Sequence, residues 1–231
     1  MSGKKVAIVQ SNYIPWKGYF DLIRSVDEFI LYDEVQFTKN DWRNRNKIKT
    51  PQGLKWLSIS ILHSISQKIN EIQVVDNKWR VKHWLTIKQF YRKSPYFCRY
   101  EELFERAYLR TSETYLSRIN YTFICLINQL LNINTKITWS SDYRMSQGKT
   151  ERLIDLCRQT GAAEYVSGPR AKDYIDEKLF NSTGIRLTWF DYSGYGSYHQ
   201  LYPPFEHKVS IIDLIFNEGP NALKYMKALN A

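Results

Sequence analysis

Apolar residues are spaced along the chain in two alternating patterns, which predict strands and helices in turn. Short apolar runs predict buried strands at residues 6–10, 29–33, 136–140, 164–167 and 186–190, and apolar residues at every second position predict another at 56–62. Helical spacing predicts helices over residues 19–24, 79–92, 111–131, 146–160, 173–181 and 209–217. Such alternation argues for a mostly parallel sheet covered by helices. We therefore expect one α/β domain over residues 1–231, Rossmann-like and nucleotidylyltransferase-like, with a helical insertion at about 78–131.

Residues that begin or end helices refine these boundaries. Thr111 or Ser112 is expected to cap the start of one helix, and Ser146 the start of the next. Gly161 is expected to end that second helix, because glycine adopts the left-handed conformation that follows many helices.

Composition narrows the class of protein. Apolar residues make up 43% of the 231 residues and charged residues 24%, which is typical of a globular protein and excludes a disordered chain. No apolar run approaches the roughly 20 residues of a membrane span, and the run at 6–9 is too short for a signal peptide. The three cysteines are scattered and the histidines lack metal-ligand spacing, so we expect no disulfide framework and no metal site. A cytoplasmic protein without a membrane span is predicted.

Charge and aromatic content indicate the kind of partner. The chain has 33 Lys and Arg against 23 Asp and Glu, a net charge of +10, together with 7 Trp, 17 Tyr and 11 Phe. An excess of cations favours an anionic partner, and rings among cations suit stacking on bases or sugars. The candidates are a nucleotide, a nucleotide-linked sugar, an RNA or an anionic membrane surface.

The first stretch with candidate chemistry covers residues 10–20, directly after the first predicted strand. Ligands bind at the carboxyl ends of strands in open α/β sheets, a glycine lets the backbone approach a phosphate, and a helix start favours an anion. The order strand, proline, aromatic-x-Gly-aromatic, helix also resembles nucleotidylyltransferases, whose turn reads His-x-Gly-His. Trp16 and Tyr19 replace those histidines, so the resemblance implies nucleotide-like binding without adenylyl transfer. An ordinary strand–helix turn with core aromatics is the alternative. The predicted binding residues here are Gln10, Asn12, Tyr13, Trp16, Lys17, Gly18 and Tyr19.

The second stretch covers residues 33–47 and follows another predicted strand. Asp33 or Asp41 is a candidate general base for an amine. Arginines can bind phosphate or carboxylate through two parallel hydrogen bonds, and asparagines can read a base or a sugar. A solvated polar loop is the alternative. The predicted binding residues are Gln36, Lys39, Trp42, Arg43, Asn44 and Arg45.

Three later loops add further candidates. Ser146 and Lys149 lie at a predicted helix start and suit an anion, although a capped helix start explains them equally well. His199 lies in a Gly/Tyr-rich loop and is the histidine best placed in the sequence for acid–base work. The loop after the strand at 164–167 could seat a substrate, with Asp173 alternatively an N-cap. Its candidates are Ser167, Gly168, Lys172, Asp173 and Tyr174.

The order of these segments resembles the WbqC-like family, small proteins found with bacterial O-antigen and other surface-polysaccharide genes. The resemblance spans roughly residues 5–219, and Ser11 stands where relatives often have proline. It is carried by residues 10–20, 33–37, 42–45, 79–83, 94–97, 149–153, 167–176 and 210–219.

This resemblance implies an N-acyltransferase that adds glycine or another acyl group to an amino sugar. The acceptor would be a nucleotide-linked sugar such as a 4-amino-4,6-dideoxyhexose, with Asp33, Asp41 or His199 taking the amine proton. No resident cofactor is predicted, and the activated acyl donor would be an aminoacyl-tRNA or an acyl-adenylate. Two other readings stay open: an ATP-using ligase or nucleotidylyltransferase-like enzyme, and a non-catalytic RNA- or nucleotide-binding module.

Overall fold

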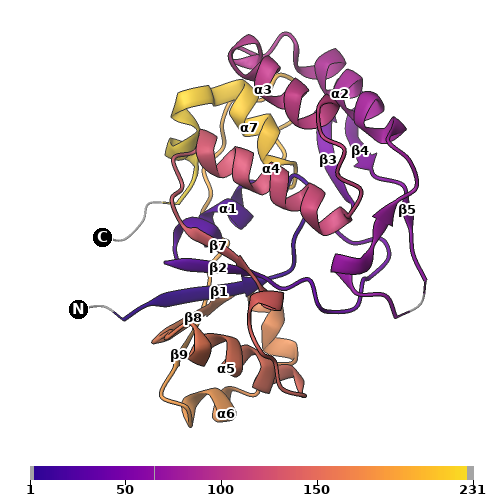
Figure 1. Cartoon of the computed structure of the whole chain (residues 1–231). Coiled ribbons are helices and arrows are strands. Elements are labelled where there is room, and N and C mark those ends of the chain that lie inside the picture. Colours follow the sequence, from indigo (N-terminus) through magenta and orange to yellow (C-terminus); the bar gives the residue numbers. More distant parts are fainter. Residues whose placement is uncertain (1–2, 65, 228–231) are drawn as a thin grey trace.

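Five parallel strands form the central sheet of the computed structural model, which describes residues 3–64 and 66–227 (Figure 1). The strand order is β7-β2-β1-β8-β9, and each strand coincides closely with one of the predicted apolar runs. The α/β, Rossmann-like fold predicted from the sequence is therefore confirmed. The bounds of the strands are β1 Lys5–Val9, β2 Glu28–Leu31, β7 Lys136–Trp139, β8 Glu164–Ser167 and β9 Arg186–Trp189.

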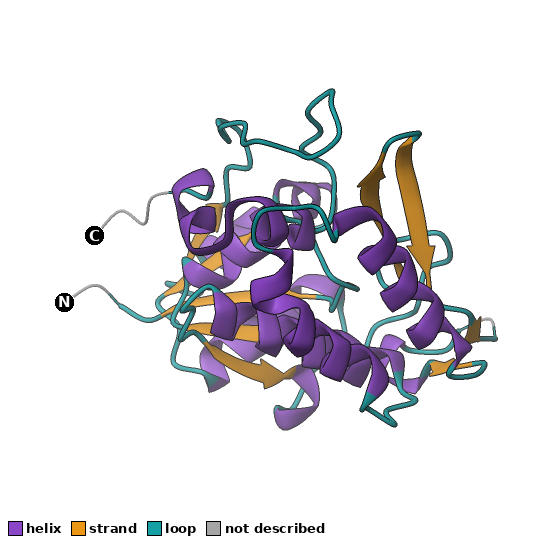
Figure 2. Ribbon diagram, turned by 90° about the horizontal axis from the view of Figure 1, so that it is seen from above, coloured by secondary structure: helices purple, strands orange, loops and turns teal. Residues whose placement is uncertain are grey.

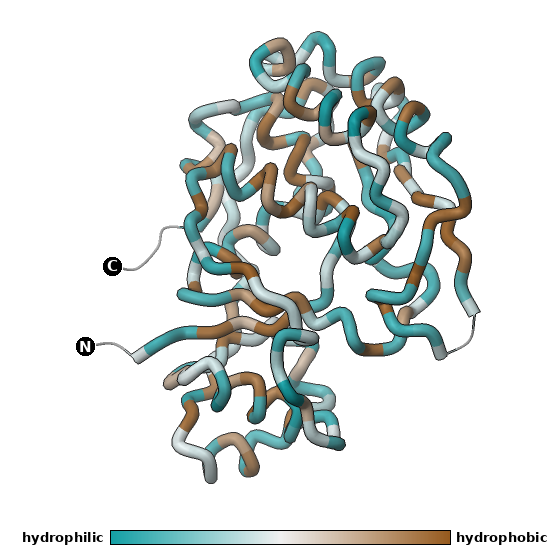
Figure 3. Tube along the Cα trace, viewed as in Figure 1, coloured by the Kyte–Doolittle hydropathy of each residue, from teal (hydrophilic) through white to brown (hydrophobic). Residues whose placement is uncertain are grey.

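Helices cover both faces of this sheet because neighbouring residues of a strand point to opposite faces. Ala7 packs into a large core with α1, α4 and α7, whereas Val6 and Ile8 pack into a smaller core with α5 and α6. Figure 3 shows hydrophobic segments in the strands and in the helices on either side. The helix bounds are α1 Lys17–Arg24, α4 Leu116–Leu130, α5 Lys149–Gln159, α6 Glu177–Asn181 and α7 Ile211–Glu218.

The helical segment between β6 and β7 contains α2 (Lys78–Tyr91), α3 (Phe97–Leu109) and α4, one helix more than the sequence predicted. Helix α3 contributes Phe97, Phe104 and Tyr108 to the larger core. Short 3-10 helices complete the described chain: η1 Ile69–Glu71, η2 Ser140–Asp142, η3 Pro169–Asp173 and η4 Gly219–Tyr225.

Two antiparallel pairs lie outside the central sheet. Strands β3 (Arg45–Thr50) and β4 (Gly53–Ser58) form a hairpin, and β5 (Ile61–Leu62) pairs with β6 (Gln73–Val74). The single strand predicted over 56–62 was wrong, since the chain leaves one pair and enters the other within that range. Figure 2 shows the hairpin standing at the side of the molecule.

The predicted N-caps of two helices were also wrong. The N-cap of α4 is Tyr115, not Thr111 or Ser112, and the N-cap of α5 is Gly148, not Ser146. Gly148 has a φ of 102°, which glycine adopts without a side-chain clash. The predicted helix over 173–181 divides into η3 and α6, whose cap is Asp176. Gly161 follows α5 with a φ of 68°, as predicted.

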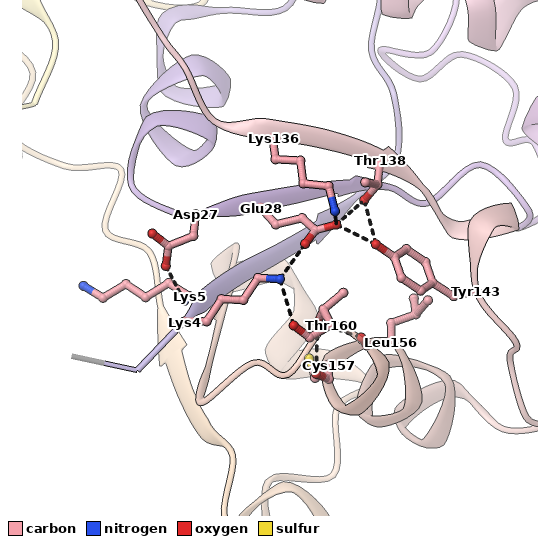
Figure 4. Close-up of polar contacts among 10 residues, drawn as sticks. All are labelled: Lys4, Lys5, Asp27, Glu28, Lys136, Thr138, Tyr143, Leu156, Cys157 and Thr160. Atoms are coloured by element: carbon pink, nitrogen blue, oxygen red, sulfur yellow. Dashed lines mark hydrogen bonds and ion pairs between the residues drawn. The ribbon is translucent and has the colours of Figure 1, made fainter. Parts of the chain in front are cut away.

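The amino edge of the sheet is held by a buried carboxylate in β2 (Figure 4). Glu28 accepts hydrogen bonds from Lys4 Nζ at 2.7 Å, Tyr143 Oη at 2.5 Å and Thr138 Oγ1 at 2.9 Å. Lys136 Nζ lies 3.2 Å from the same carboxylate. Burial alone would raise the pKa of Glu28, but these hydrogen bonds outweigh it and lower the pKa from 4.5 to about 2.

Replacing this carboxylate is expected to destabilise the fold. Glu28→Gln should lower the free energy of unfolding at pH 7 by about 1–3 kcal/mol, measured by urea unfolding. Because the folded pKa is depressed, the contribution of Glu28 is complete above pH 4.5 and is lost as the pH falls through about 2, so the difference should shrink over that window. Glu102→Gln, which breaks a surface pair with Arg106, is the control. Equal effects of the two variants would contradict the prediction.

Candidate ligand-binding site

The strand order places a topological switch point between β1 and β8. From β1 the chain builds outward to β2 and β7, and it then returns to the other side of β1 with β8 and β9. Crevices at the carboxyl ends of strands on either side of such a point are where open α/β sheets bind ligands. The loops after these two strands begin at Gln10 and Gly168.

A buried arginine underlies the loop that follows β1. Arg43 is 9% exposed, and its Nη1 and Nη2 donate to the side-chain oxygens of Asn12 and Gln10. The carboxylate of Asp41 lies 3.5 Å from Nη2. Burial lowers the pKa of Arg43 and Asp41 opposes that shift, but an arginine remains protonated in a protein. The loop after β1 is therefore built over the permanently charged Arg43 guanidinium, which donates to two neutral amide side chains.

Asp33, at the end of the neighbouring strand, anchors the same loop from within. Its Oδ1 accepts from the Ser11 backbone N–H at 2.8 Å and its Oδ2 accepts from the Ser117 hydroxyl. The residue is 1% exposed, and burial raises the pKa of its carboxyl despite these hydrogen bonds. Both oxygens are occupied, so this geometry is that of a positioning residue.

The next part of the loop is strained and clamped. Ile14 has a φ of 37°, a conformation that is unusual for a β-branched residue. Its carbonyl accepts from Asn46 Nδ2 at 2.9 Å and from the Ser210 hydroxyl at 2.7 Å. Two distant segments therefore hold the turn that leads into α1.

A cavity of about 540 Å³ opens above these loops. Its walls come from the β1–α1 turn, the start of the hairpin, the loop after β8 and the long loop between β9 and α7. Four aromatic rings, two amides and two cations lie in the wall, together with one histidine. The lining residues are Asn12, Pro15, Trp16, Trp42, Asn46, Arg170, Tyr192, Gly194, Tyr195, His207 and Lys208.

Trp16 connects the turn to the long loop. Its ring lies 5.5 Å from the ring of Tyr192 and 5.5 Å from that of Tyr195. The indole also lies against Gly18, where a Cβ atom would sit 2.7 Å from Cε2 of Trp16. The sequence suggested that Gly18 lets a phosphate approach the backbone. In the structure its open side is filled by Trp16.

Adding a methyl group at this position is expected to displace the indole. Gly18→Ala should lower the free energy of unfolding by about 1–3 kcal/mol and weaken binding of a nucleotide-linked sugar, because Trp16 forms part of the cavity wall. Urea unfolding and calorimetric titration measure the two effects. Gly196→Ala is the matched control, since no atom lies within 4 Å of its added Cβ. The same losses in both variants would contradict this role for Gly18.

Lys17 fixes the long loop, residues 190–210, to the start of α1. It is 3% exposed, donates to the Gly196 carbonyl at 3.1 Å and lies 5.0 Å from the ring centre of Tyr195. Burial lowers its pKa to about 8. Lys17 therefore supports the wall and was not found in its lining, although the sequence suggested it as a binding residue.

His207 is the titratable base of the cavity. Burial and, next, the nearby Lys17 ammonium lower the pKa of His207 below its ordinary 6.5, so the imidazole is neutral at pH 7. His199, the histidine chosen from the sequence, is exposed like His207 but is absent from the lining, and its backbone N–H donates to Glu218. Asp41 is also outside the lining, with its oxygens near Thr38, Trp42 and Arg43.

The other residues predicted from the first two stretches line the cavity, support its wall from behind or lie exposed at the protein surface. From the first two stretches, Asn12, Trp16 and Trp42 line the cavity, with Gln10 and Arg43 directly behind it. The supporting side chains are Tyr13, bonded to His83 and Tyr108; Tyr19, bonded to the Gln10 carbonyl; and Asn44, bonded to the Ile59 carbonyl. Gln36 and Lys39 are exposed, and Arg45 lies on the hairpin.

The residues predicted from the later loops lie outside the lining. Ser146 and Lys149 are exposed at the start of α5, and the Ser167 hydroxyl donates to Tyr165. Lys172 lies 5.4 Å from the ring of Trp189. Gly168 sits at the start of η3, and Asp173 and Tyr174 are exposed. Of this loop, the cavity uses Arg170 instead.

Sequence reasoning missed the wall that the long loop supplies. Tyr192, Tyr195, His207 and Lys208 come from a segment without regular structure, so no periodic pattern locates them. The density of Gly and Tyr between 192 and 202 was the available signal, and it drew attention to His199, which lies outside the lining, and not to His207.

The described residues contain neither a metal-binding cluster nor a membrane-spanning helix. Over 3–64 and 66–227, no cluster of three or more His, Cys, Asp and Glu side chains has the spacing to hold a metal ion. Within the same ranges, no helix has both the length and the apolar character needed to cross a membrane.

The sheet order and the cavity at its switch point define a Rossmann-like α/β protein with a crevice at the carboxyl ends of its strands. The chain belongs to the WbqC-like protein family, whose model matches residues 10–225. An uncharacterized protein of Mycobacterium tuberculosis is 48% identical over 226 residues, which cover 97% of this chain and 98% of the relative. No solved structure matches the chain.

Proposed function

We propose that the protein is an N-acyltransferase of bacterial surface-polysaccharide (O-antigen) biosynthesis that acts in the cytoplasm on a nucleotide-linked amino sugar. The observation that carries the proposal is the composition of the cavity. The lining combines four aromatic rings, two cations and a neutral histidine, and it contains no carboxylate. Membership of the WbqC-like family supports the polysaccharide context.

The wall matches the parts of a nucleotide-linked sugar. Rings such as Trp16 and Trp42 suit a base or the apolar face of a sugar. Arg170 and Lys208 suit the diphosphate, because an arginine fork and an ammonium both bind phosphate oxygens. The oxygen of Asn12 is occupied by Arg43, which leaves its Nδ2 group to donate to a sugar hydroxyl or a developing oxyanion.

His207 supplies the base that amide formation needs. The amine nitrogen attacks the acyl carbonyl, a C–N bond forms, and the bond from the carbonyl carbon to the leaving oxygen breaks. The proton released by the amine passes to His207 and then to that leaving oxygen. A neutral imidazole at pH 7 is in the protonation state to accept it. The donor is an activated acyl group, either an acyl-adenylate or an aminoacyl-tRNA.

The β1–α1 turn resembles that of nucleotidylyltransferases but lacks the two histidines that serve their chemistry. Trp16 and Tyr19 occupy the positions of the paired histidines, and Tyr19 donates to the Gln10 carbonyl at 3.1 Å. No imidazole is therefore held at that turn to stabilise a transferring phosphate. This arrangement favours acyl transfer over nucleotidyl transfer.

A product assay tests the proposal. Purified protein is incubated with glycyl donors and nucleotide-linked 4-amino-4,6-dideoxyhexoses, and the amide is detected by mass spectrometry. We expect an amide that disappears in Arg170→Ala, with Arg186→Ala as the control, because Arg186 is exposed in β9 and absent from the lining. Substrate-dependent pyrophosphate release from ATP, without an amide, would support a ligase or nucleotidylyltransferase instead.

A further inference from the structure

One face of the β3–β4 hairpin carries rings and cations beside the cavity. Residues directly opposite each other in an antiparallel pair share a face, and Lys47 is opposite Trp56. Arg45, two residues away, shares that face, with its guanidinium 4.4 Å from the Trp56 ring centre. Lys47 Nζ lies 4.9 Å from the same centre. The ring of Trp42, a cavity residue, is 5.5 Å from that of Trp56, so the face continues into the cavity.

This face has an unbalanced positive charge. Residues 42–70 contain six Lys and Arg and no Asp or Glu. Across the part of the chain that the structure describes, Arg43 alone of these six lies within ion-pair distance of a carboxylate, that of Asp41. Trp56 is 42% exposed, which is unusual for the largest aromatic side chain. Exposed indole with uncompensated cations is the composition of surfaces that bind single-stranded nucleic acid.

We propose that this hairpin face, formed by Trp42, Arg45, Lys47 and Trp56, binds single-stranded RNA, and that this RNA carries the activated acyl group. The second clause rests on the proposed function. An acyl-adenylate has only one base and one phosphate, whereas a strand supplies the several bases and phosphates that the rings and cations of the hairpin match. With the acyl group held as an ester on the terminal ribose, amine attack forms the C–N bond, breaks the ester C–O bond and returns a proton to the ribose hydroxyl.

Fluorescence anisotropy with a labelled, unacylated single-stranded RNA of about 12 nucleotides tests the surface directly. Trp56→Ala should weaken binding about 5- to 100-fold, because stacking on one ring contributes that much. Lys47→Gln should reduce the slope of log affinity against log salt by about 0.7, the value for one phosphate contact with a single strand. Tyr115→Ala and Lys178→Gln are matched controls on other surfaces and should bind like the parent chain.

The outcomes separate the hypotheses. Absence of RNA binding, equal losses in the control variants, or binding of phosphatidylglycerol vesicles without binding of RNA would overturn the proposal. Thermal unfolding verifies that Trp56→Ala remains folded. Because the RNA is unacylated and no acceptor is present, this result is independent of amide formation. RNA binding that depends on Trp56, with no amide from an acylated RNA, would leave the surface established and contradict the proposed transferase reaction and the carrier role.

Discussion

His207→Gln is expected to lower the turnover number for amide formation about 10²- to 10⁴-fold, the contribution of a positioned general base. The glutamine retains a polar group in the cavity wall, so the dissociation constant for the nucleotide-linked sugar should change little. Steady-state rates and calorimetric titration measure the two quantities. The division between them is the signature of a base, because a residue that only shapes the wall would alter affinity.

The pH dependence provides an independent check on the same residue. The pKa of His207 lies below 6.5, so the imidazole is neutral at pH 7 and gains a proton as the medium becomes more acidic. The rate should therefore fall as the pH drops through that lowered pKa, and His207→Gln should remove this acidic limb. Loss of rate in His199→Gln together with a normal rate in His207→Gln would contradict this assignment. It would identify His199, the histidine chosen from the sequence, as the base.

Arg43→Ala is expected to have the second large effect, on stability and on binding together. It leaves the half-buried side-chain oxygens of Gln10 and Asn12 without their donor. Removing the charged donor of these two hydrogen bonds lowers the free energy of unfolding by about 1–3 kcal/mol. Asn12 would also lose its orientation in the cavity wall, which should weaken ligand binding at least tenfold.

Urea unfolding and calorimetry measure both consequences of the Arg43 substitution. Lys39→Ala removes an exposed cation from the same loop and is the control. Arg43→Lys refines the test, since one ammonium keeps the charge but lacks the planar fork that spans two acceptors. Full retention of stability in Arg43→Ala would contradict the role of this residue as the support of the loop.

The central sheet was predictable because its three inner strands, β1, β2 and β8, are largely buried on both faces. Strands such as β1 and β8 therefore appear as short continuous apolar runs, whatever the rest of the chain does. The hairpin strand β3 was not found because only its inner face is apolar, and that face carries Asn46 and Thr50 on either side of Ile48. Helix α3 did have apolar residues at helical spacing, including Phe97, Phe104 and Tyr108, and was overlooked.

The candidate site was predictable only where it follows a strand. Asn12, Trp16 and Trp42 lie close in sequence to the ends of β1 and β2, so their place at the carboxyl edge could be inferred. His207 comes from a loop whose path depends on distant contacts, such as that of Lys17 with Gly196. The residues next to His207 in the sequence do not predict those contacts. Long-range packing therefore decides which histidine enters the cavity.

The positions of the two cavity walls in the sequence also determine when the cavity can first form during synthesis. One wall ends with Asn46, whereas the other extends from Arg170 to Lys208. The residues of the first wall leave the ribosome long before those of the second. Strand β1 can pair with β8 only after the intervening helices have been synthesised. A nascent chain lacking Lys208 has no complete cavity. If the proposed nucleotide-linked sugar binds there, it stabilises finished chains selectively, by about 2.7 kcal/mol at a hundredfold excess over Kd, and favours their survival over incomplete ones during proteolysis.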